Sequence, residues 1–198
     1  MANDGGIIKG GGIIVNASAS PGGLLEFPPM IPDIVLEAIQ FAAREHHGQM
    51  RKDGKTPYVS HPYRVMFLLR HVFCVEDPEI LAAAVLHDTI EDTTADYDDV
   101  AEKFGPRVAG MVSSLSKDSR LPEKEREGAY FDDLAKAPIE VKLCKLADTL
   151  DNLLDSRGAK PEFQKKTIGK AGELVQRFEP GFPGEWSHAL EAVRAAAK

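Results

Sequence analysis

The amino-acid sequence predicts an all-α protein, a bundle of roughly eight or nine helices. From about residue 30 onwards, apolar residues recur at the three- and four-residue spacing of helices that pack on a core. Proline, glycine and aspartate stand at the ends of these periodic segments, where helices begin and end. No run of alternating apolar and polar residues is long enough to build a sheet. With 198 residues, of which 43% are hydrophobic and 28% are charged, the composition is that of one globular domain.

The first 28 residues are the exception to this pattern. They are rich in glycine and lack apolar periodicity, so we expect a Gly-rich tail at 1–28 and a single domain at 29–198. The N-terminus has no basic start and no continuous apolar stretch, which makes it a poor signal peptide. No apolar run approaches the roughly 20 residues that span a bilayer, which favours a cytoplasmic protein without a membrane partner. Cys74 and Cys144 are too few for a disulfide framework and are expected to be small buried hydrophobic residues.

The helices are predicted one by one from apolar stripes and their end signals. A stripe from Ile34 to Ala42 is followed by Gly48, a stop signal. The next helix begins near Pro62 and the third at Asp77, because proline is tolerated in a first turn and aspartate caps it. The stretch 80–86 is apolar on every side, so the third helix is expected to lie at the centre. Further helices are predicted at 97–104, 106–116, 123–136, 138–155, 161–178 and 184–197.

Charge is unevenly distributed along the chain. The formal net charge of −7 disfavours nucleic acid as a partner, because such binding depends on a basic surface. Residues 44–70 nevertheless hold six basic side chains against two acidic ones, whereas residues 88–102 hold seven carboxylates and no lysine or arginine. A basic segment facing an acidic one suits a metal-assisted phosphate site, and a solvated charged surface is the alternative.

A histidine and three carboxylates follow the central apolar stretch, in the segment LHDTIED. If the helix continues through this segment, His87 and Glu91 lie on one face, with Asp88 and Asp92 one step around it. Burying an unpaired charge is costly, so the cluster needs a cation, a partner or an exit to solvent. Three interpretations of His87 and Asp88 follow: a structural His–Asp pair, a helix end emerging into water, or two ligands of one metal ion.

Two other segments offer further metal donors. His61 stands directly before Pro62, where a cap or surface position is the alternative. Asp148 falls within the apolar stripe of VKLCKLADTLDNLL, an unfavourable place for an unpaired carboxylate. Lys145 and Asn152 share its helix face, and a Lys145–Asp148 ion pair on a solvated face would be a simple structural explanation.

Together these donors would form a mixed set of two imidazoles and two carboxylates. Such a set suits Mn²⁺, Fe²⁺, Co²⁺ or Zn²⁺ better than Ca²⁺, and it leaves positions for water. Spacing alone does not bring three helices together, so their convergence is a prediction. The candidate metal ligands are His61, His87, Asp88 and Asp148.

Three segments in this order resemble the HD-domain hydrolases of the RelA/SpoT type, above all the stand-alone small alarmone hydrolases that include the metazoan SpoT homologue. The segments are HGQMRKDGKTPYVSHP, HDTIEDT and VKLCKLADTLDNL, and the resemblance extends over about residues 34–155. It implies an HD-domain helical bundle with one Mn²⁺ ion, or Fe, Co or Zn in its place, held by the four donors. The implied reaction is hydrolysis of the 3′-diphosphate of the guanosine nucleotide (p)ppGpp to GDP or GTP and pyrophosphate.

The resemblance also implies roles for residues around the metal. Glu91 and Asp92 match the pair that orients and activates the attacking water, so they are the candidate catalytic residues. A second group is implied to bind the substrate, and for its two lysines a solvated surface position is the alternative. The group consists of Arg51 and Lys52 at the nucleotide, Tyr58 and Ser60 beside the first histidine, and Lys145 and Asn152 facing phosphate and ribose.

Three positions in the last segment depart from the family pattern. Thr149 stands where Arg or Lys is usual, Asp151 where His or Tyr is usual, and Leu154 where Arg is usual. Near a nucleotide, these changes would alter base preference and phosphate affinity. They favour two alternatives: an HD phosphohydrolase acting on another nucleotide, such as the 2′-phosphate of NADPH, or a non-catalytic nucleotide-sensing module. The intact Glu91 and Asp92 argue against the sensing module.

Overall fold

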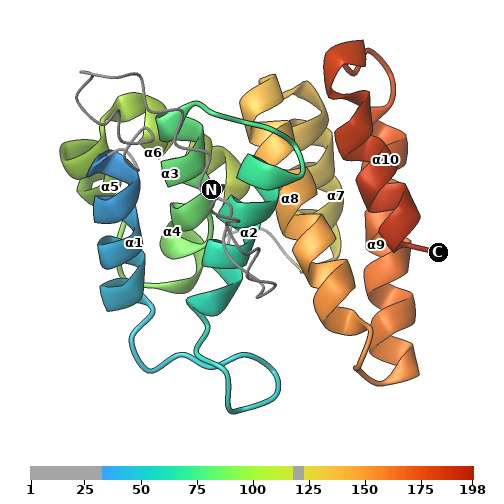
Figure 1. Ribbon diagram of the computed structural model, residues 1–198, viewed down its shortest axis with the longest axis horizontal. Coiled ribbons are helices and arrows are strands. Elements are labelled where there is room, and N and C mark those ends of the chain that lie inside the picture. Colours follow the sequence, from blue (N-terminus) through green and yellow to red (C-terminus); the bar gives the residue numbers. More distant parts are fainter. Residues whose placement is uncertain (1–32, 118–122) are drawn as a thin grey trace, which may run out of the picture. The chain divides into compact units, whose positions relative to one another are not determined.

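The computed structural model describes residues 33–117 and 123–198, and the regular elements of these residues are all helices (Figure 1). The prediction of an all-α bundle is therefore confirmed, while the predicted tail at 1–28 lies outside the described residues. The helices are α1 (Asp33–Glu45), α2 (Ser60–His71), α3 (Pro78–Leu86), α4 (Thr89–Asp92), α5 (Tyr97–Phe104), α6 (Pro106–Leu115), α7 (Glu123–Lys136), α8 (Ile139–Ser156), α9 (Pro161–Phe178) and α10 (Ser187–Ala196), with a 3₁₀ turn at Gly184–Trp186.

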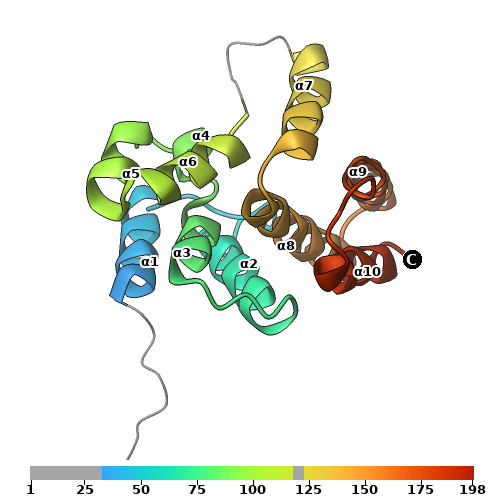
Figure 2. The same cartoon turned by 90° about the horizontal axis from the view of Figure 1, so that it is seen from above.

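Helix α3 lies at the centre of the bundle, as its uninterrupted apolar stretch predicts. It packs against α1, α2, α6 and α8, and α8 in turn packs against α2, α9 and α10 (Figure 2). Every residue from Ile80 to Leu86 is buried. Because a fully buried aliphatic side chain contributes about 1.5–3 kcal/mol, this one helix contributes strongly to the stability of the bundle.

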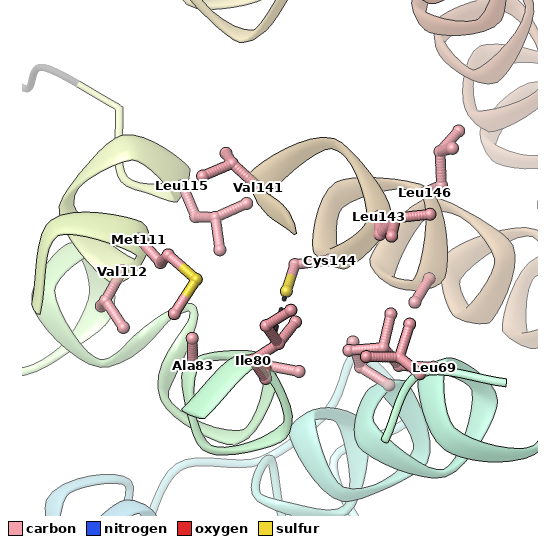
Figure 3. Close-up of a cluster of buried hydrophobic side chains, with 14 of the residues drawn as sticks. Leu69, Ile80, Ala83, Met111, Val112, Leu115, Val141, Leu143, Cys144 and Leu146 are labelled. Carbon is pink, nitrogen blue, oxygen red and sulfur yellow. Dashed lines mark hydrogen bonds between the residues drawn. The ribbon is translucent and has the colours of Figure 1, made fainter. Parts of the chain in front are cut away.

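One apolar cluster joins the central helices (Figure 3). Ile80 and Ala83 of α3 belong to it together with Met111 and Leu115 of α6 and Cys144 of α8. The Cys144 thiol donates to the carbonyl oxygen of Ile80 at 3.7 Å. This packing fixes α3 relative to α8, so polar groups at the end of one helix can meet polar groups on the other.

The end signals read from the sequence act as predicted. The Asp77 carboxylate accepts hydrogen bonds from the amides of Glu79 (2.9 Å) and Ile80 (3.4 Å) at the start of α3. Proline occupies the first turn of α3, α6 and α9. Gly105, between α5 and α6, has a φ of +86°, a conformation that glycine adopts without strain.

The prediction of one continuous helix through the HDTIED segment is wrong. Helix α3 stops before His87, and the short α4 covers Thr89–Asp92, so His87 and Asp88 lie in a turn. His87 donates its Nδ1 proton to the carbonyl oxygen of Ala84 (2.8 Å), which an uninterrupted helix would pair with the Asp88 amide. The turn brings the His87 Nε2 and Asp88 Oδ2 atoms to 3.0 Å.

The predictions for the two cysteines have different outcomes. Cys144 is buried, as predicted, but Cys74 is exposed, so the prediction for Cys74 is wrong. Cys74 lies in the connection between α2 and α3 with a φ of +60°, outside the apolar stripe of either helix.

Among the residues that the structure describes, no helix is both long and apolar enough to cross a membrane.

The loop between α1 and α2 is held by its own hydrogen bonds. The Asp53 carboxylate accepts from the amides of Lys55 and Thr56, both at 2.9 Å, and from the Thr56 hydroxyl at 2.6 Å. These bonds, led by the hydroxyl, lower the pKa of Asp53 to about 2. Met50 and Pro57 form an isolated bridge across the loop. The loop therefore enters α2 in one defined conformation.

Candidate metal centre and active site

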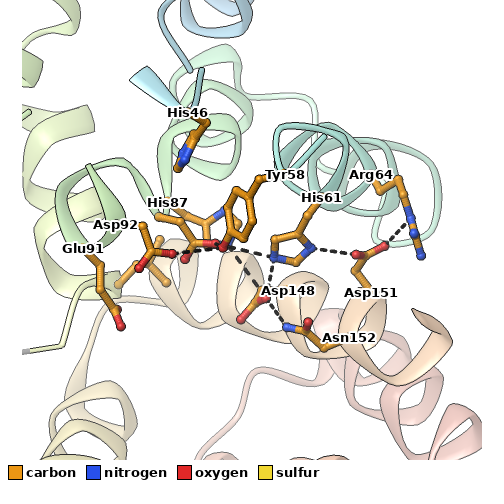
Figure 4. Close-up of polar contacts among 12 residues, drawn as sticks. His46, Tyr58, His61, Arg64, His87, Glu91, Asp92, Asp148, Asp151 and Asn152 are labelled. Carbon is orange, nitrogen blue, oxygen red and sulfur yellow. Dashed lines mark hydrogen bonds and ion pairs between the residues drawn. The ribbon is translucent and has the colours of Figure 1, made fainter. Parts of the chain in front are cut away.

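The four candidate donors come from three parts of the chain and lie close together, and Figure 4 shows His61, His87 and Asp148 among them. His61 lies in the first turn of α2, His87 and Asp88 in the turn after α3, and Asp148 in α8. His61 Nε2 lies 3.1 Å from Asp148 Oδ1 and 3.6 Å from Asp88 Oδ2. His87 Nε2 lies 3.0 Å from Asp88 Oδ2 and 3.8 Å from Asp148 Oδ1. His61, His87 and Asp88 thus offer donor atoms that lie within 4.8 Å of one another, and Asp148 approaches this group through the two imidazole nitrogens.

The electrostatics of this group favour a cation. Burial opposes the ionisation of Asp88 and Asp148, yet positive neighbours hold both pKa values below their ordinary range. These neighbours are the imidazoles at Asp88, and Lys145 followed by the imidazoles at Asp148. Burial likewise opposes a charged His61, but hydrogen bonds to Asp148 and Asp151 outweigh it and raise the pKa of His61 to about 9. Ionised carboxylates at this depth stabilise positive charge placed among them.

The tautomer of His87 fits a metal ligand. Its Nδ1 atom lies 2.8 Å from the Ala84 carbonyl oxygen, which can only accept, so Nδ1 carries the proton and Nε2 presents a lone pair. This buried Nε2 has no hydrogen-bond partner and faces oxygens of Asp88 and Asp148. A lone pair buried against two carboxylates is unfavourable unless a proton or a metal ion lies between them. The donor set therefore suits a divalent transition metal.

Two structural alternatives do not fit the geometry. His87 is 3% exposed, so the interpretation of a helix end emerging into water is wrong. Lys145 does pair with Asp148 (Nζ to Oδ2, 2.7 Å), but the two side chains are 16% and 7% exposed, so the pair is not on a solvated face. Asn152 donates to the other oxygen of Asp148 at 2.6 Å. These two neighbours fix the carboxylate that faces both histidines.

Tyr58 connects the donors to the candidate catalytic carboxylates. Its hydroxyl lies 2.6 Å from Asp88 Oδ2 and 3.1 Å from Asp92 Oδ2. Burial and the charge of Asp88 raise the pKa values of both Tyr58 and Asp92. Glu91 is instead paired with Lys117, with Oε1 and Nζ 2.9 Å apart. Asp92 is therefore linked to the donors through one hydroxyl, whereas Glu91 is held by a lysine.

Two residues that were not identified from the sequence support this arrangement. Gln49 donates to the Asp92 carbonyl oxygen at 2.7 Å, and its side-chain oxygen lies 2.9 Å from His46 Nδ1. His46 is 3% exposed, and its ring centroid lies 5.0 Å from that of Tyr58. Gln49 falls inside the first motif segment, so its place in that segment could have identified it. His46 precedes the segment, and nothing in the sequence marks it.

A cavity of about 480 Å³ opens beside Asp148 and Asn152. Burial and the positive charges of Arg51, Lys166 and Lys170 lower the pKa of Lys52 there. One acidic neighbour, Glu127, pairs with Lys170, so the cavity keeps an excess of positive charge suited to a polyphosphate. The lysines lining the cavity are the predicted Lys52 and Lys145 together with Lys117, Lys166 and Lys170, which sequence reasoning missed.

A second cavity, of about 610 Å³, shares the side chains of Lys52 and Phe163 with the first. The ammonium group of Lys52 lies 3.6 Å from the centre of the Phe163 ring. The predicted Arg51 and Ser60 line this second cavity, and Arg51 donates to Asp155 at 2.7 Å. The predicted substrate-binding residues are thus distributed over two adjoining cavities and the donor group.

The three departures from the family pattern lie in different surroundings. Thr149 lines the lysine-rich cavity. Asp151 lines neither cavity: it is fully buried, and its Oδ2 atom lies 2.7 Å from His61 Nδ1. Leu154 packs against the hydrophobic core. Asp151 lies next to the second cavity, because Arg64, which it contacts, and Asp155, one turn further along α8, both line it. Leu154 lines neither of the two cavities, and the effect of these two residues on the nucleotide stays a prediction.

Comparison with known proteins agrees with this geometry. The profile of the HD domain family matches residues 38–175. The guanosine-3′,5′-bis(diphosphate) 3′-pyrophosphohydrolase MESH1 of Drosophila melanogaster is 44% identical over 121 residues, 61% of this chain and 68% of that protein. Its human namesake is 42% identical over 162 residues, 81% of this chain and 90% of that protein.

The same relationship is seen in three dimensions. A solved structure, described as a metazoan ortholog of SpoT that hydrolyses ppGpp and plays a role in starvation responses, aligns with a TM-score of 0.74 at 34% identity. The alignment covers 85% of this chain and 96% of the other. The resemblance inferred from the three segments is thereby confirmed, and the chain belongs to the HD domain family as a homologue of these hydrolases.

Proposed function

We propose that this protein hydrolyses the 3′-diphosphate of (p)ppGpp to GDP or GTP and pyrophosphate, using one divalent metal ion, Mn²⁺. The observation that carries the proposal is the meeting of His61, His87, Asp88 and Asp148 beside a lysine-lined cavity. Hydrolysis of a polyphosphate ester is helped by a Lewis acid at the reacting phosphoryl group and by positive charge around the remaining phosphates. The activity for which the MESH1 relatives are named supports the same substrate.

The four donors would hold the ion, and Mn²⁺, Fe²⁺, Co²⁺ and Zn²⁺ all accept such ligands. A divalent ion supplies Lewis acidity, which polarises phosphoryl oxygens and makes water acidic enough to ionise near neutral pH. The contribution of the chain is to fix the ligands before the substrate arrives. Lys145 and Asn152 hold Asp148, and the Ala84 carbonyl oxygen holds His87.

Release of intact pyrophosphate defines which bonds change. The water oxygen bonds to the phosphorus that carries the ribose 3′-oxygen. The bond between that phosphorus and the 3′-oxygen breaks, and the 3′-oxygen takes up a proton. Asp92 is the candidate base, because its pKa is raised and the Tyr58 hydroxyl joins it to the metal ligand Asp88. Glu91, held by Lys117, is the candidate residue for orienting the water.

The two cavities suggest how the substrate lies. Lys145 is the cavity lysine in contact with Asp148, which assigns it to the 3′-diphosphate. Lys166 and Lys170, on α9, are available to further phosphate groups. Arg51, in the adjoining cavity, presents a planar guanidinium that stacks well on a nucleobase.

The test is the release of pyrophosphate and GDP from ppGpp by the purified protein with added Mn²⁺. Asp88→Asn is the matched variant, because it keeps the shape of the side chain and removes its charge. We expect the two products in equal amounts, and only when both Mn²⁺ and Asp88 are present. No release by folded, metal-loaded protein would refute the proposal, and full activity of the variant would refute the metal ligands.

Thr149 favours a second candidate substrate. It lines the cavity at a position where the family usually has a positive charge, so the cavity is less cationic than expected. A phosphohydrolase acting on another nucleotide, such as the 2′-phosphate of NADPH, fits this change. Measuring kcat/KM for ppGpp, pppGpp and NADPH separates the two, and turnover of any of them excludes a non-catalytic sensing module.

A further inference from the structure

We propose that Asp151 positions His61 for metal binding and that Arg64 holds Asp151 in place. The inference rests on the metal site of the proposed function and deepens it by naming the group that decides which ring nitrogen of His61 faces the ion. Asp151 is fully buried and lines neither cavity, so its route to the ion is through His61, which it contacts directly. It is therefore a positioning residue.

Helix α8 contacts both ring nitrogens of His61 (Figure 4). Asp148 Oδ1 lies 3.1 Å from Nε2, and Asp151 Oδ2, three residues further along the helix, lies 2.7 Å from Nδ1. An ionised carboxylate can only accept, so the bond to Asp151 places the imidazole proton on Nδ1. Asp148 faces Nε2 on the opposite side of the ring, so a metal ion bound among the donors would take the place of a proton on Nε2 and meet its lone pair.

A carboxylate as deeply buried as Asp151 needs a compensating partner, and Arg64 is that partner. The Arg64 Nε atom lies 2.8 Å from Asp151 Oδ1, an ion-pair contact that lacks the alignment of a hydrogen bond. Arg64 follows His61 by three residues on α2, just as Asp151 follows Asp148 by three residues on α8. Because α2 packs on α8, the two pairs meet side by side and each oxygen of Asp151 has one contact from α2.

The two metal-binding imidazoles are thus oriented by different acceptors. His87 donates its Nδ1 proton to a neutral backbone carbonyl, whereas His61 donates to a charged carboxylate. A carboxylate partner fixes the ring and also makes the opposite nitrogen a stronger electron donor to a metal. Asp151 should therefore contribute to the affinity for the ion without touching it.

The decisive comparison is Asp151→Asn against Asp155→Asn. Both changes remove one negative charge from α8 next to Arg64, whose Nη1 lies 3.2 Å from Asp155, but only Asp151 contacts His61. Each protein is titrated with MnCl₂ while the EPR signal of free Mn²⁺ is followed. We expect the Kd for Mn²⁺ to rise about 10- to 100-fold in Asp151→Asn and to change less than about twofold in Asp155→Asn.

Each outcome of this titration has a distinct meaning. Equal Mn²⁺ affinity in the wild type and Asp151→Asn would overturn the inference and leave the proposed function standing. No Mn²⁺ binding by the wild type would overturn the metal site itself, and with it both proposals. Arg64→Gln keeps Asp151 but removes its ion pair, so we expect a smaller rise in Kd, and an unchanged value would overturn the part assigned to Arg64.

A second measurement uses the wild-type protein alone, in case Asp151→Asn fails to fold. Long-range ¹H–¹⁵N correlation spectra of the Zn²⁺-loaded, ¹⁵N-labelled protein identify the ring nitrogen of His61 that carries the proton. We expect the proton on Nδ1, shifted far downfield by its hydrogen bond to Asp151. A proton on Nε2, with Nδ1 as the ligand, would overturn the inference.

Discussion

The four proposed metal donors and the neighbouring lysine-lined cavity differ in how they are built. His61, His87 and Asp148 are buried and Asp88 is half-buried, with side chains that are 2% exposed at His61 and 18% exposed at Asp88. The lysines come from the α1–α2 loop, the residues that follow α6, and helices α8 and α9, and the Lys170 side chain is 44% exposed. A rigid buried group can hold reacting atoms in place, whereas an open cationic surface supplies attraction. Changes in the donors should therefore lower kcat, and changes in the outer lysines should raise KM.

The largest expected effect is that of Asp148→Asn, which removes one donor and leaves Lys145 without its ion pair. We expect kcat for ppGpp to fall at least about 1,000-fold, because several kcal/mol of transition-state stabilisation would be lost. The measurement is steady-state kinetics with saturating Mn²⁺, with circular dichroism to verify the helical content. Asp98→Asn, at the exposed start of α5, is the control and should retain full activity. A rise in KM with an unchanged kcat would instead mean that Asp148 acts in substrate binding, as the lysines do.

Addition of Mn²⁺ should stabilise the fold through the donors alone. A ligand present at 100 times its Kd stabilises the folded state by about 2.7 kcal/mol, which raises the Tm of a chain of this size by roughly 5–10 °C. Thermal denaturation with and without Mn²⁺ tests this, and EDTA should reverse the shift. Asp148→Asn should show little shift, and an equal shift in that variant would mean that the ion binds elsewhere.

A smaller effect is expected from Lys166→Gln, in the cavity wall. The loss of one partly exposed charge should raise KM for ppGpp about fivefold, the equivalent of roughly 1 kcal/mol, while kcat stays the same. The difference should shrink at high salt, because exposed charges are screened. Lys165→Gln is the matched control, since this neighbouring lysine is exposed and does not line the cavity. A loss of kcat in Lys166→Gln would contradict the division between donors and lysines.

The fold was predictable because its signals are local. Pro78, Gly105 and Pro161 mark helix ends in the sequence, and the structure begins or ends helices there. The break at His87 was not predictable in this way, since it accompanies a side-chain hydrogen bond to the carbonyl oxygen of Ala84. Apolar periodicity describes which face is buried and contains no information about such competition.

The site was predictable only as far as its motifs extend. The donors and the substrate-binding candidates lie in three recognisable segments, and the structure brings the donors close together and distributes the candidates over two adjoining cavities and the donor group. Lys166 and Lys170 lie outside those segments on α9, where an exposed lysine gives no signal. Asp151 lies inside one, but its role depends on the side of α8 that meets α2. Helix pairing of this kind is a property of tertiary packing, which spacing along one helix does not determine.

The smallest expected effect concerns the loop that carries Arg51 and Lys52 to the cavities. Asp53 in this loop has a pKa lowered to about 2, first by the Thr56 hydroxyl and then by the amides of Thr56 and Lys55. A lowered pKa means that the ionised carboxylate stabilises the loop above about pH 4, and that this contribution is lost as the pH falls through about 2. In an NMR titration, the Thr56 amide resonance should therefore stay constant down to about pH 4 and move only below it. In Asp53→Asn this movement should be absent, while a midpoint near pH 4 in the wild type would mean that the hydrogen bonds do not hold the loop. Because Asp53 is exposed and bonds only within its own loop, its protonation should loosen the loop locally and leave the helical content unchanged.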